Sequence, residues 1–258
     1  MMDEVRGQGR LLGAVYPDDA WVDVEAEAMV EEFRRFMPSE VRLMSSATPG
    51  PIPRAQAEDL AEHFIQLAEN GDIEESARRL SKYDPDCYAY YCTTISFVRG
   101  VGGETDISER ITRMTGKPAT TTSAAMIEAF KALKISSVTL ASPYMPDVEA
   151  HFIKFIQDNG VKVLNSLALN SEIQHSSVPP ERIRQLAESS NIEESDAVFV
   201  GCTGQKLALH LDDMEAKLGK PVLTANQVTS WHALRLMGVQ PCLAGRGKLF
   251  SRDLLGTA

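Results

Sequence analysis

Short apolar runs alternate with longer amphipathic runs along almost all of the 258 residues. Short apolar runs are typical of buried strands, and the longer runs carry apolar residues at the spacing of one helix face. Strands that alternate with helices of this length indicate a mostly parallel α/β sheet. We predict strands at 11–16, 41–46, 87–91, 119–122, 137–142, 162–167, 197–201 and 222–224. We predict helices at 20–36, 55–69, 124–133, 148–157, 181–188 and 206–218.

Several local patterns occur twice, and in the same order. Asp86 stands six residues before Cys92-Thr93, and Asp196 stands six residues before Cys202-Thr203. The other matched pairs are Asp-Val-Glu-Ala at 23–26 and 147–150, and Gly-Lys-Pro at 116–118 and 219–221. Each match is weak by itself, but their common order indicates an internal duplication.

The duplication predicts two similar halves. We expect two doubly wound parallel-sheet halves related by a pseudo-twofold axis, with an active site in the cleft between them. We assign residues 1–121 and 226–258 to an N-terminal α/β half, and residues 122–225 to a C-terminal α/β half.

The ends of two matched strands carry the most informative side chains. Cys92 ends one predicted strand and Cys202 ends its counterpart. Ligands of open parallel sheets bind at the carboxyl ends of the strands, so the two thiols are expected to face each other. We also expect a helix to begin just after each cysteine, where free N–H groups and the helix dipole favour a carboxylate and a thiolate. An ionised thiol opposite a neutral one can invert a carbon centre, add to an activated double bond or protonate a carbanion.

Further polar groups lie at the same predicted edge. Tyr144 directly follows a strand and Pro143, where a phenol can donate to a carboxylate. Gly204 lets the backbone approach a ligand closely. Hydroxyl donors next to the cysteines are Thr93, Thr94 and Thr203.

Composition excludes several classes of function. The net charge of −10 argues against nucleic acid as a partner, because binding it requires a basic face. No apolar run is long enough to span a membrane, and Met1–Glu4 lacks the features of a signal peptide, so we expect a cytoplasmic protein. A homodimer is the default expectation for a symmetric oligomer.

The sequence indicates neither a metal site nor an organic cofactor. The four cysteines form no C-x-x-C pair and have no histidine near them in sequence. The glycine-rich run at 100–103 does not have the spacing of a dinucleotide-binding motif, and no P-loop occurs. Cys87, early in its strand, and Cys242, in a Pro-Cys-Leu segment, are interpreted as small buried hydrophobes.

Taken together, these motifs resemble the aspartate/glutamate racemase superfamily, in the branch that holds maleate cis-trans isomerases and arylmalonate decarboxylases. The resemblance covers nearly the whole chain. It is strongest at 116–123 with 142–144, at 169–173, and at 198–203 with 219–221 and 226–227.

The resemblance implies roles for individual residues. In the isomerases one thiolate adds to the double bond of maleate, the other thiol supplies a proton, and the adduct rotates and eliminates as fumarate. Carried over, Cys92 is the nucleophile and Cys202 the acid, while Tyr144 and Asn170 match positions that hold substrate carboxylates. No cofactor takes part. In the decarboxylases only the second cysteine is kept.

One difference from the isomerases leaves the identity of the substrate open. The isomerases carry Pro-Ser-Ser-Asn after the first strand, whereas this chain has Pro17-Asp18-Asp19-Ala20. Pro17 matches a substrate-side position, but a carboxylate near a dianion costs energy in a low-dielectric site. The first reading is a two-cysteine isomerase acting on a small carboxylate or dicarboxylate, most like maleate isomerase. The alternatives are a racemase or arylmalonate-type decarboxylase on the same scaffold, and a small-acid-binding protein without turnover.

Overall fold

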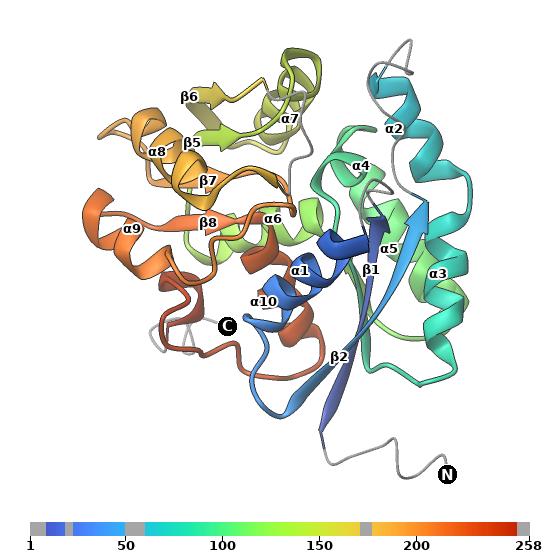
Figure 1. Cartoon of the computed structure of the whole chain (residues 1–258). Helices are drawn as coiled ribbons and strands as arrows, with labels where there is room; N and C mark the ends of the chain where they lie inside the picture. The colour runs from blue at the N-terminus through green and yellow to red at the C-terminus, as the bar shows by residue number, and fades with distance from the viewer. Residues whose placement is uncertain (1–8, 19–22, 50–59, 171–176, 252–258) are drawn as a thin grey trace.

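The computed structural model describes residues 9–18, 23–49, 60–170 and 177–251 (Figure 1). Its strands are β1 (Arg10–Asp18), β2 (Val41–Pro49), β3 (Cys87–Tyr90), β4 (Ala119–Thr121), β5 (Ser137–Ser142), β6 (Lys162–Ala168), β7 (Ala197–Val200) and β8 (Val222–Thr224). Its helices are α1 (Asp23–Arg34), α2 (Leu60–Glu69), α3 (Asp72–Ser81), α4 (Thr93–Phe97), α5 (Gly103–Thr115), α6 (Thr122–Ala132), α7 (Pro146–Asp158), α8 (Pro180–Ser190), α9 (Leu211–Leu218), α10 (Ala225–Leu236) and the 3₁₀ helix η3 (Lys248–Phe250).

The strands form two four-stranded sheets of the same design. The first sheet has the order β2-β1-β3-β4 and the second has the order β6-β5-β7-β8. Every described strand pair is parallel. The two sheets therefore have the same topology, with β5, β6, β7 and β8 in the places of β1, β2, β3 and β4. The predicted α/β fold with two related parallel-sheet halves is therefore confirmed.

The matched aspartates occupy equivalent places at the starts of β3 and β7. The Asp86 carboxylate accepts a hydrogen bond from the Leu11 N–H on β1 at 2.8 Å. The Asp196 carboxylate accepts one from the Ser137 N–H on β5 at 2.9 Å. Each aspartate thus fixes the start of the central strand pair in its own sheet, six residues before a cysteine.

The two Gly-Lys-Pro segments also have the same structural role. Gly116 and Gly219 end α5 and α9 in the left-handed conformation, with φ of 70° and 68°. Such a conformation favours glycine because a side chain is strained there. The carbonyls of Pro118 and Pro221 then accept hydrogen bonds from Tyr88 and Val198, which begins pairing with β3 and β7.

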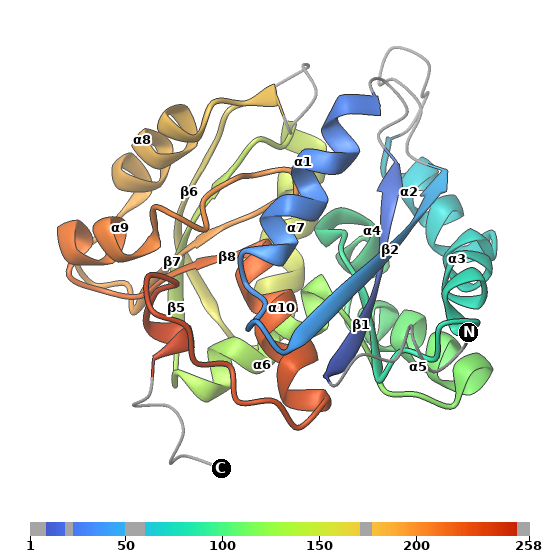
Figure 2. The same cartoon turned by 60° about the horizontal axis from the view of Figure 1, so that its bottom comes forward.

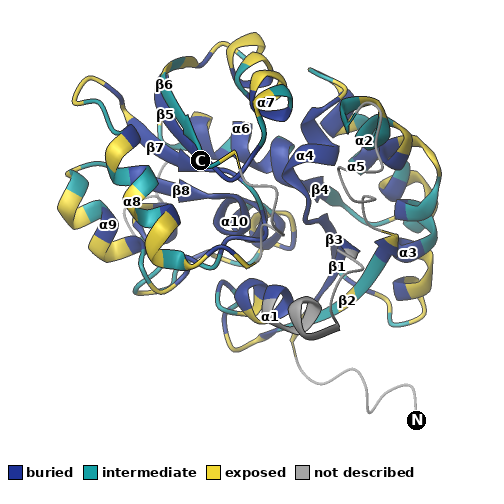
Figure 3. Ribbon diagram, turned by 45° about the horizontal axis from the view of Figure 1, so that its top comes forward, coloured by how far each residue is buried: buried dark blue, intermediate teal, exposed yellow. Residues whose placement is uncertain are grey.

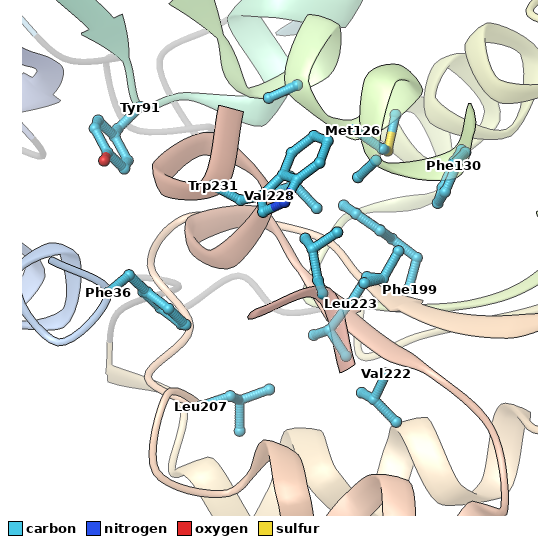
Figure 4. Packing of buried hydrophobic residues seen from close by; sticks show 14 of the residues in the cluster. Phe36, Tyr91, Met126, Phe130, Phe199, Leu207, Val222, Leu223, Val228 and Trp231 are labelled. Atoms are coloured by element: carbon cyan, nitrogen blue, oxygen red, sulfur yellow. The ribbon is translucent and has the colours of Figure 1, made fainter. Parts of the chain in front are cut away.

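Helices α6 and α10 lie between the two sheets and pack against each other (Figures 1 and 2). Figure 4 shows Trp231 and Val228 of α10 between Tyr91, beside β3, and Phe199 of β7. These side chains belong to one buried apolar cluster that includes residues of both sheets. The halves therefore share a core, and the predicted division at 121/122 and 225/226 stays a prediction.

The outer helices differ from the expectation in three places. Helices α3 and α5 were not predicted, and they cover the face of the first sheet that lies away from α10. Residues 206–210, expected to open a helix, are not helical: 208–210 form a turn, and α9 begins at Leu211. The first residues of the helix predicted at 55–69 lie outside the described residues. None of the described helices has the length and apolar character needed to cross a membrane.

Candidate active site

The two cysteines occupy equivalent positions at the carboxyl ends of the central strands. Strand β3 ends at Tyr90 and β7 ends at Val200, and each cysteine follows two residues later. The Cys92 side chain is 8% exposed and Cys202 is half-buried. Figure 3 shows that the surrounding helices α4 and α10 are largely buried. Both thiols therefore lie inside the molecule at the predicted edge of the two sheets.

The Tyr144 side chain brings residues of both sheets together. Its hydroxyl interacts with the side chains of Thr94 and Thr93, and charge on Cys202 or Cys92 acts on it. Burial raises the pKa of Tyr144 well above its ordinary value, and charge on Cys202 raises it further. The phenol therefore stays protonated at neutral pH and can donate a hydrogen bond. Five residues predicted to form the site are thus neighbours in space.

Two serines, Ser96 and Ser123, hold the backbone around Cys92 by hydrogen bonds. Ser96 Oγ donates to the Cys92 carbonyl at 2.6 Å and lies 2.7 Å from Ser123 Oγ. Ser123 Oγ also lies 3.2 Å from the Thr93 carbonyl oxygen. All of these groups are buried, so their hydrogen bonds replace water that the backbone cannot reach. The short helix α4 begins at Thr93, directly after Cys92, as predicted.

The segment after Cys202 is held by Asn226 of α10. Asn226 Nδ2 donates to the carbonyl oxygens of Thr203 at 2.9 Å and Gln205 at 3.0 Å. Ser123 and Asn226 both stand two residues beyond a capping threonine, and each bonds the carbonyl of the threonine after a cysteine. The duplicated design therefore includes the supports of the cysteines as well as the cysteines themselves.

The helix predicted directly after Cys202 is absent, and that prediction was wrong. Residues 203–204 form a turn, and Cys202 itself has a φ of 76°, which is strained for a residue with a side chain. The Gly204 N–H donates to Cys202 Sγ at 3.4 Å, so a single backbone group takes the place of the expected helix terminus.

The Asn226 amide is expected to contribute strongly to stability. Asn226→Ala would leave two buried carbonyls without their donor, which costs about 2–4 kcal/mol. Urea unfolding followed by circular dichroism measures this loss. Asn159→Ala, which removes one hydrogen bond from a partly buried asparagine at the end of α7, is the matched control and should cost about 1 kcal/mol or less. Equal losses in the two variants would contradict the role assigned to Asn226.

A buried carboxyl group positions the segment that carries Tyr144. The Tyr144 N–H donates to Ser142 Oγ at 3.2 Å, and Ser142 Oγ in turn donates to the Glu149 carboxyl group. Glu149 also receives a hydrogen bond from Ser166 of β6, and burial raises its pKa. Gly201 completes this fit, because a Cβ atom there would lie 3.2 Å from the Tyr144 ring.

The remaining predicted residues have other surroundings. The Thr203 hydroxyl donates to the Tyr91 carbonyl at 3.3 Å and so joins the two sheets. Pro17 ends up buried near the end of β1, beside Thr48 of β2. Asn170 follows the edge strand β6, is exposed and has a φ of 51°. The side chain of Asp18, and all of Asp19 and Ala20, lie outside the described part of the chain, as do residues 171–173 of the predicted asparagine loop.

The other two cysteines differ from the site pair. Cys87 is fully buried in the core, and burial raises its pKa to about 12, in line with the predicted packing role. Cys242 is half-buried in the segment after α10. Within the described residues, no three His, Cys, Asp or Glu side chains are grouped so that they could hold a metal ion.

The chain is similar to known proteins along most of its length. The family model of arylmalonate decarboxylase matches residues 62–250, which is more than half of the chain. The chain belongs to the arylmalonate decarboxylase family. The matched segment contains both site cysteines and every described strand from β3 to β8. The predicted membership of this branch is therefore confirmed.

Relatives of the family with two different activities are similar to the chain. A maleate isomerase of Pseudomonas putida is 22% identical over 249 residues, covering 93% of this chain and 96% of the relative. An arylmalonate decarboxylase of Bordetella bronchiseptica is 26% identical over 186 residues, covering 70% of this chain and 78% of the relative. A solved structure of a mutant Nocardia farcinica maleate cis-trans isomerase, with a covalently bound succinylcysteine intermediate, has a TM-score of 0.81 at 19% identity. That match covers 95% of this chain and 99% of the other.

Several residues of the site were not predicted from the sequence. Tyr90 lies in the same buried cluster as Cys92, Thr48 influences Tyr90, and Glu149 supports the Tyr144 segment. Ser123 and Asn226 could have been found, because they occupy matched positions in the two repeats, just after a capping threonine. The others carry no local signal, since their partners are distant in sequence.

Proposed function

We propose that the protein is a cofactor-independent isomerase that converts maleate to fumarate with two cysteines. The observation that carries the proposal is the pair of thiols at matched strand ends, with the Tyr144 hydroxyl close to both. A thiolate and a thiol in one site supply a nucleophile and an acid, which is what addition to an activated double bond requires. The similarity to maleate isomerases of two bacterial species supports the same reaction.

The proposed cycle needs only the substrate and the two sulfur atoms. The Cys92 thiolate adds to one alkene carbon of maleate, and the Cys202 thiol protonates the other, which gives a succinyl thioether. Rotation about the new single bond brings the two carboxylates anti to each other. The Cys202 thiolate then removes the proton, the Cys92 thiolate leaves, and fumarate is released. Both thiols return to their starting states, so no reductant or oxidant is consumed.

The Tyr144, Thr93 and Thr94 hydroxyls are proposed to hold one substrate carboxylate. They lie together next to both cysteines and are largely buried, so their hydrogen bonds to an anion are strong. The Gly204 N–H stabilises negative charge on Cys202 when that residue has given up its proton. These three hydroxyls and the Gly204 N–H thus each have a task in the proposed cycle.

Decarboxylation of an arylmalonate is the second candidate, because the family model and one relative carry that activity in their names. In that reaction a carboxylate leaves as CO₂ and the Cys202 thiol protonates the remaining carbanion, so Cys92 would not be needed. The presence of a second thiol at the matched position favours the isomerase.

One experiment separates these functions. Purified protein without added cofactor is incubated in deuterated water with maleate, phenylmalonate, aspartate or glutamate, and the products are followed by proton NMR. Conversion of maleate to fumarate is the expected result. Phenylacetate formation would establish the decarboxylase instead, and exchange of the α-hydrogen of an amino acid would establish a racemase. A raised melting temperature with no reaction would indicate a binding protein.

A further inference from the structure

Tyr90 is a fully buried tyrosine that the proposed cycle does not use. It is the last residue of β3, and the alternation of side chains along a strand places Tyr88, Tyr90 and Cys92 on one face. These three side chains belong to the same buried cluster beneath α3 and α5. Tyr91 points to the opposite face, where its hydroxyl lies 2.9 Å from Ser230 Oγ of α10. The Tyr90 phenol is thus directed to the side of the sheet that holds the Cys92 thiol.

The register of β1, β2 and β3 places Thr48 on the same face of the sheet as Tyr90. Tyr90 is paired with Val15 of β1, and Val15 is paired with Ser46 of β2. Thr48, two residues beyond Ser46, therefore lies on the same face of the sheet, at its carboxyl end. The Tyr90 hydroxyl is buried and has no hydrogen-bond partner within ordinary distance among the described residues, and Cys92 of the same cluster and Thr48 are the side chains that influence it. Since Thr48 Oγ1 donates to the Pro49 carbonyl at 3.2 Å, it can accept from Tyr90.

The Tyr90 phenol stays protonated at neutral pH and can therefore donate a hydrogen bond. Burial raises the pKa of Tyr90 well above its ordinary value, and charge on Cys92 raises it further, whereas Thr48 lowers it. Tyr144, which also lies near Cys92, is kept neutral by burial in the same way. Neither phenol therefore competes with the cysteine for the negative charge.

The second half has no equivalent of this group. Val200 stands two residues before Cys202, where Tyr90 stands two residues before Cys92, and a valine cannot donate a hydrogen bond. Cys202 Sγ accepts from the Gly204 N–H instead. The two repeats match in their strands, their aspartates and the positions of the polar side chains that support the cysteine segments. They differ at the residue two positions before each cysteine, which is Tyr90 in one repeat and Val200 in the other.

We infer that the Tyr90 hydroxyl donates a hydrogen bond to the Cys92 thiolate and thereby makes Cys92 the ionised member of the cysteine pair. Thr48 competes with Cys92 as the acceptor of this hydrogen bond. The importance of this for catalysis rests on the proposed function. The effect of Tyr90 on the ionisation of Cys92 does not, because it is measured in the resting protein without substrate.

Alkylation of Cys92 tests the inference without any substrate. The rate of modification by iodoacetamide is measured against pH in wild type and Tyr90→Phe. Since the thiolate is the reactive form, loss of one charge-assisted hydrogen bond is expected to raise the apparent pKa of Cys92 by about one unit and slow alkylation near neutral pH about tenfold. Trypsin releases one peptide, between Lys82 and Arg99, that holds Cys87 and Cys92, and fragment ions distinguish the two sulfur atoms.

Tyr91→Phe is the matched control, because it removes the hydroxyl of an equally buried neighbour that faces away from Cys92. Its alkylation profile should coincide with that of wild type. Thr48→Val is a second, independent variant. It leaves Cys92 as the acceptor of the Tyr90 proton, so alkylation should become about two- to threefold faster.

The outcomes are distinct from those of the substrate experiment. An unchanged profile in Tyr90→Phe, an equal change in Tyr91→Phe, or slower alkylation in Thr48→Val would each overturn the inference. If maleate is not a substrate but Tyr90→Phe still slows alkylation, the proposed function fails and the role of Tyr90 in the ionisation of Cys92 stands.

Discussion

Cys92→Ser is expected to lose the conversion of maleate to fumarate while keeping the fold. A serine hydroxyl ionises at far higher pH than a thiol and is a poor nucleophile without a base, so the addition step should fail. The expected loss in kcat/KM is on the order of 10³-fold or more. The change in ultraviolet absorbance as the cis alkene is converted to the trans isomer, or proton NMR, measures the rate.

Cys242→Ser is the matched control, because it makes the same change at a half-buried cysteine outside the site, in the segment after α10. It should retain wild-type activity. Retention of activity within a few-fold of wild type in Cys92→Ser would remove Cys92 from the nucleophile position. Equal losses in both variants would indicate general damage by serine and not a specific role.

Cys202→Ser is expected to stop turnover in a different way, with the substrate bound covalently. Cys92 can still add to maleate, and a slow proton from solvent or serine completes the succinyl adduct. Removal of that proton then needs a base, and a serine is a much weaker one at neutral pH than a cysteine. Turnover should fall roughly 10²–10⁴-fold, the usual worth of a positioned acid–base group. Intact-protein mass spectrometry should show an increase equal to one maleic acid.

Peptide mapping decides where the adduct is attached. Recovery on Cys92 is expected, and the double variant Cys92→Ser/Cys202→Ser should show no adduct. An adduct on Cys87 or Cys242 would contradict the assigned roles. So would a Cys202→Ser protein with wild-type turnover, because the acid would then have to be another group.

The strands and their parallel order could be predicted because each strand is a short apolar run between helical patterns. Strands β5 and β8 have the predicted bounds, and the others differ by a few residues at most. Helix α3 was missed because its buried face is narrow, with Ile73, Ala77 and Leu80 among charged residues. Helix α5 opens at Gly102-Gly103, and glycine is a poor helix former, so its start carries no usual signal.

The site was predicted only as far as the chain repeats itself. The position of Cys92 and Cys202 at strand ends follows from the duplication, and Tyr144 follows from its place after β5. The left-handed turn at Cys202 could not be predicted, because a cysteine carries no preference for it. Tyr90 looks like an ordinary core aromatic in the sequence. Its contact with Thr48 depends on the register of three strands, which no local pattern specifies.

The hydrogen bond from the Thr203 hydroxyl to the Tyr91 carbonyl bears on how substrate enters. It joins Thr203, which follows Cys202, to Tyr91, which precedes Cys92. A rotation that moved the two sheets apart would therefore break this hydrogen bond. The shared core around Trp231 resists the same rotation, because opening it would expose apolar area to water. We therefore expect the distance between the two sulfur atoms to stay constant through each turnover. We expect substrate to enter and product to leave through local rearrangements at the edge of the site.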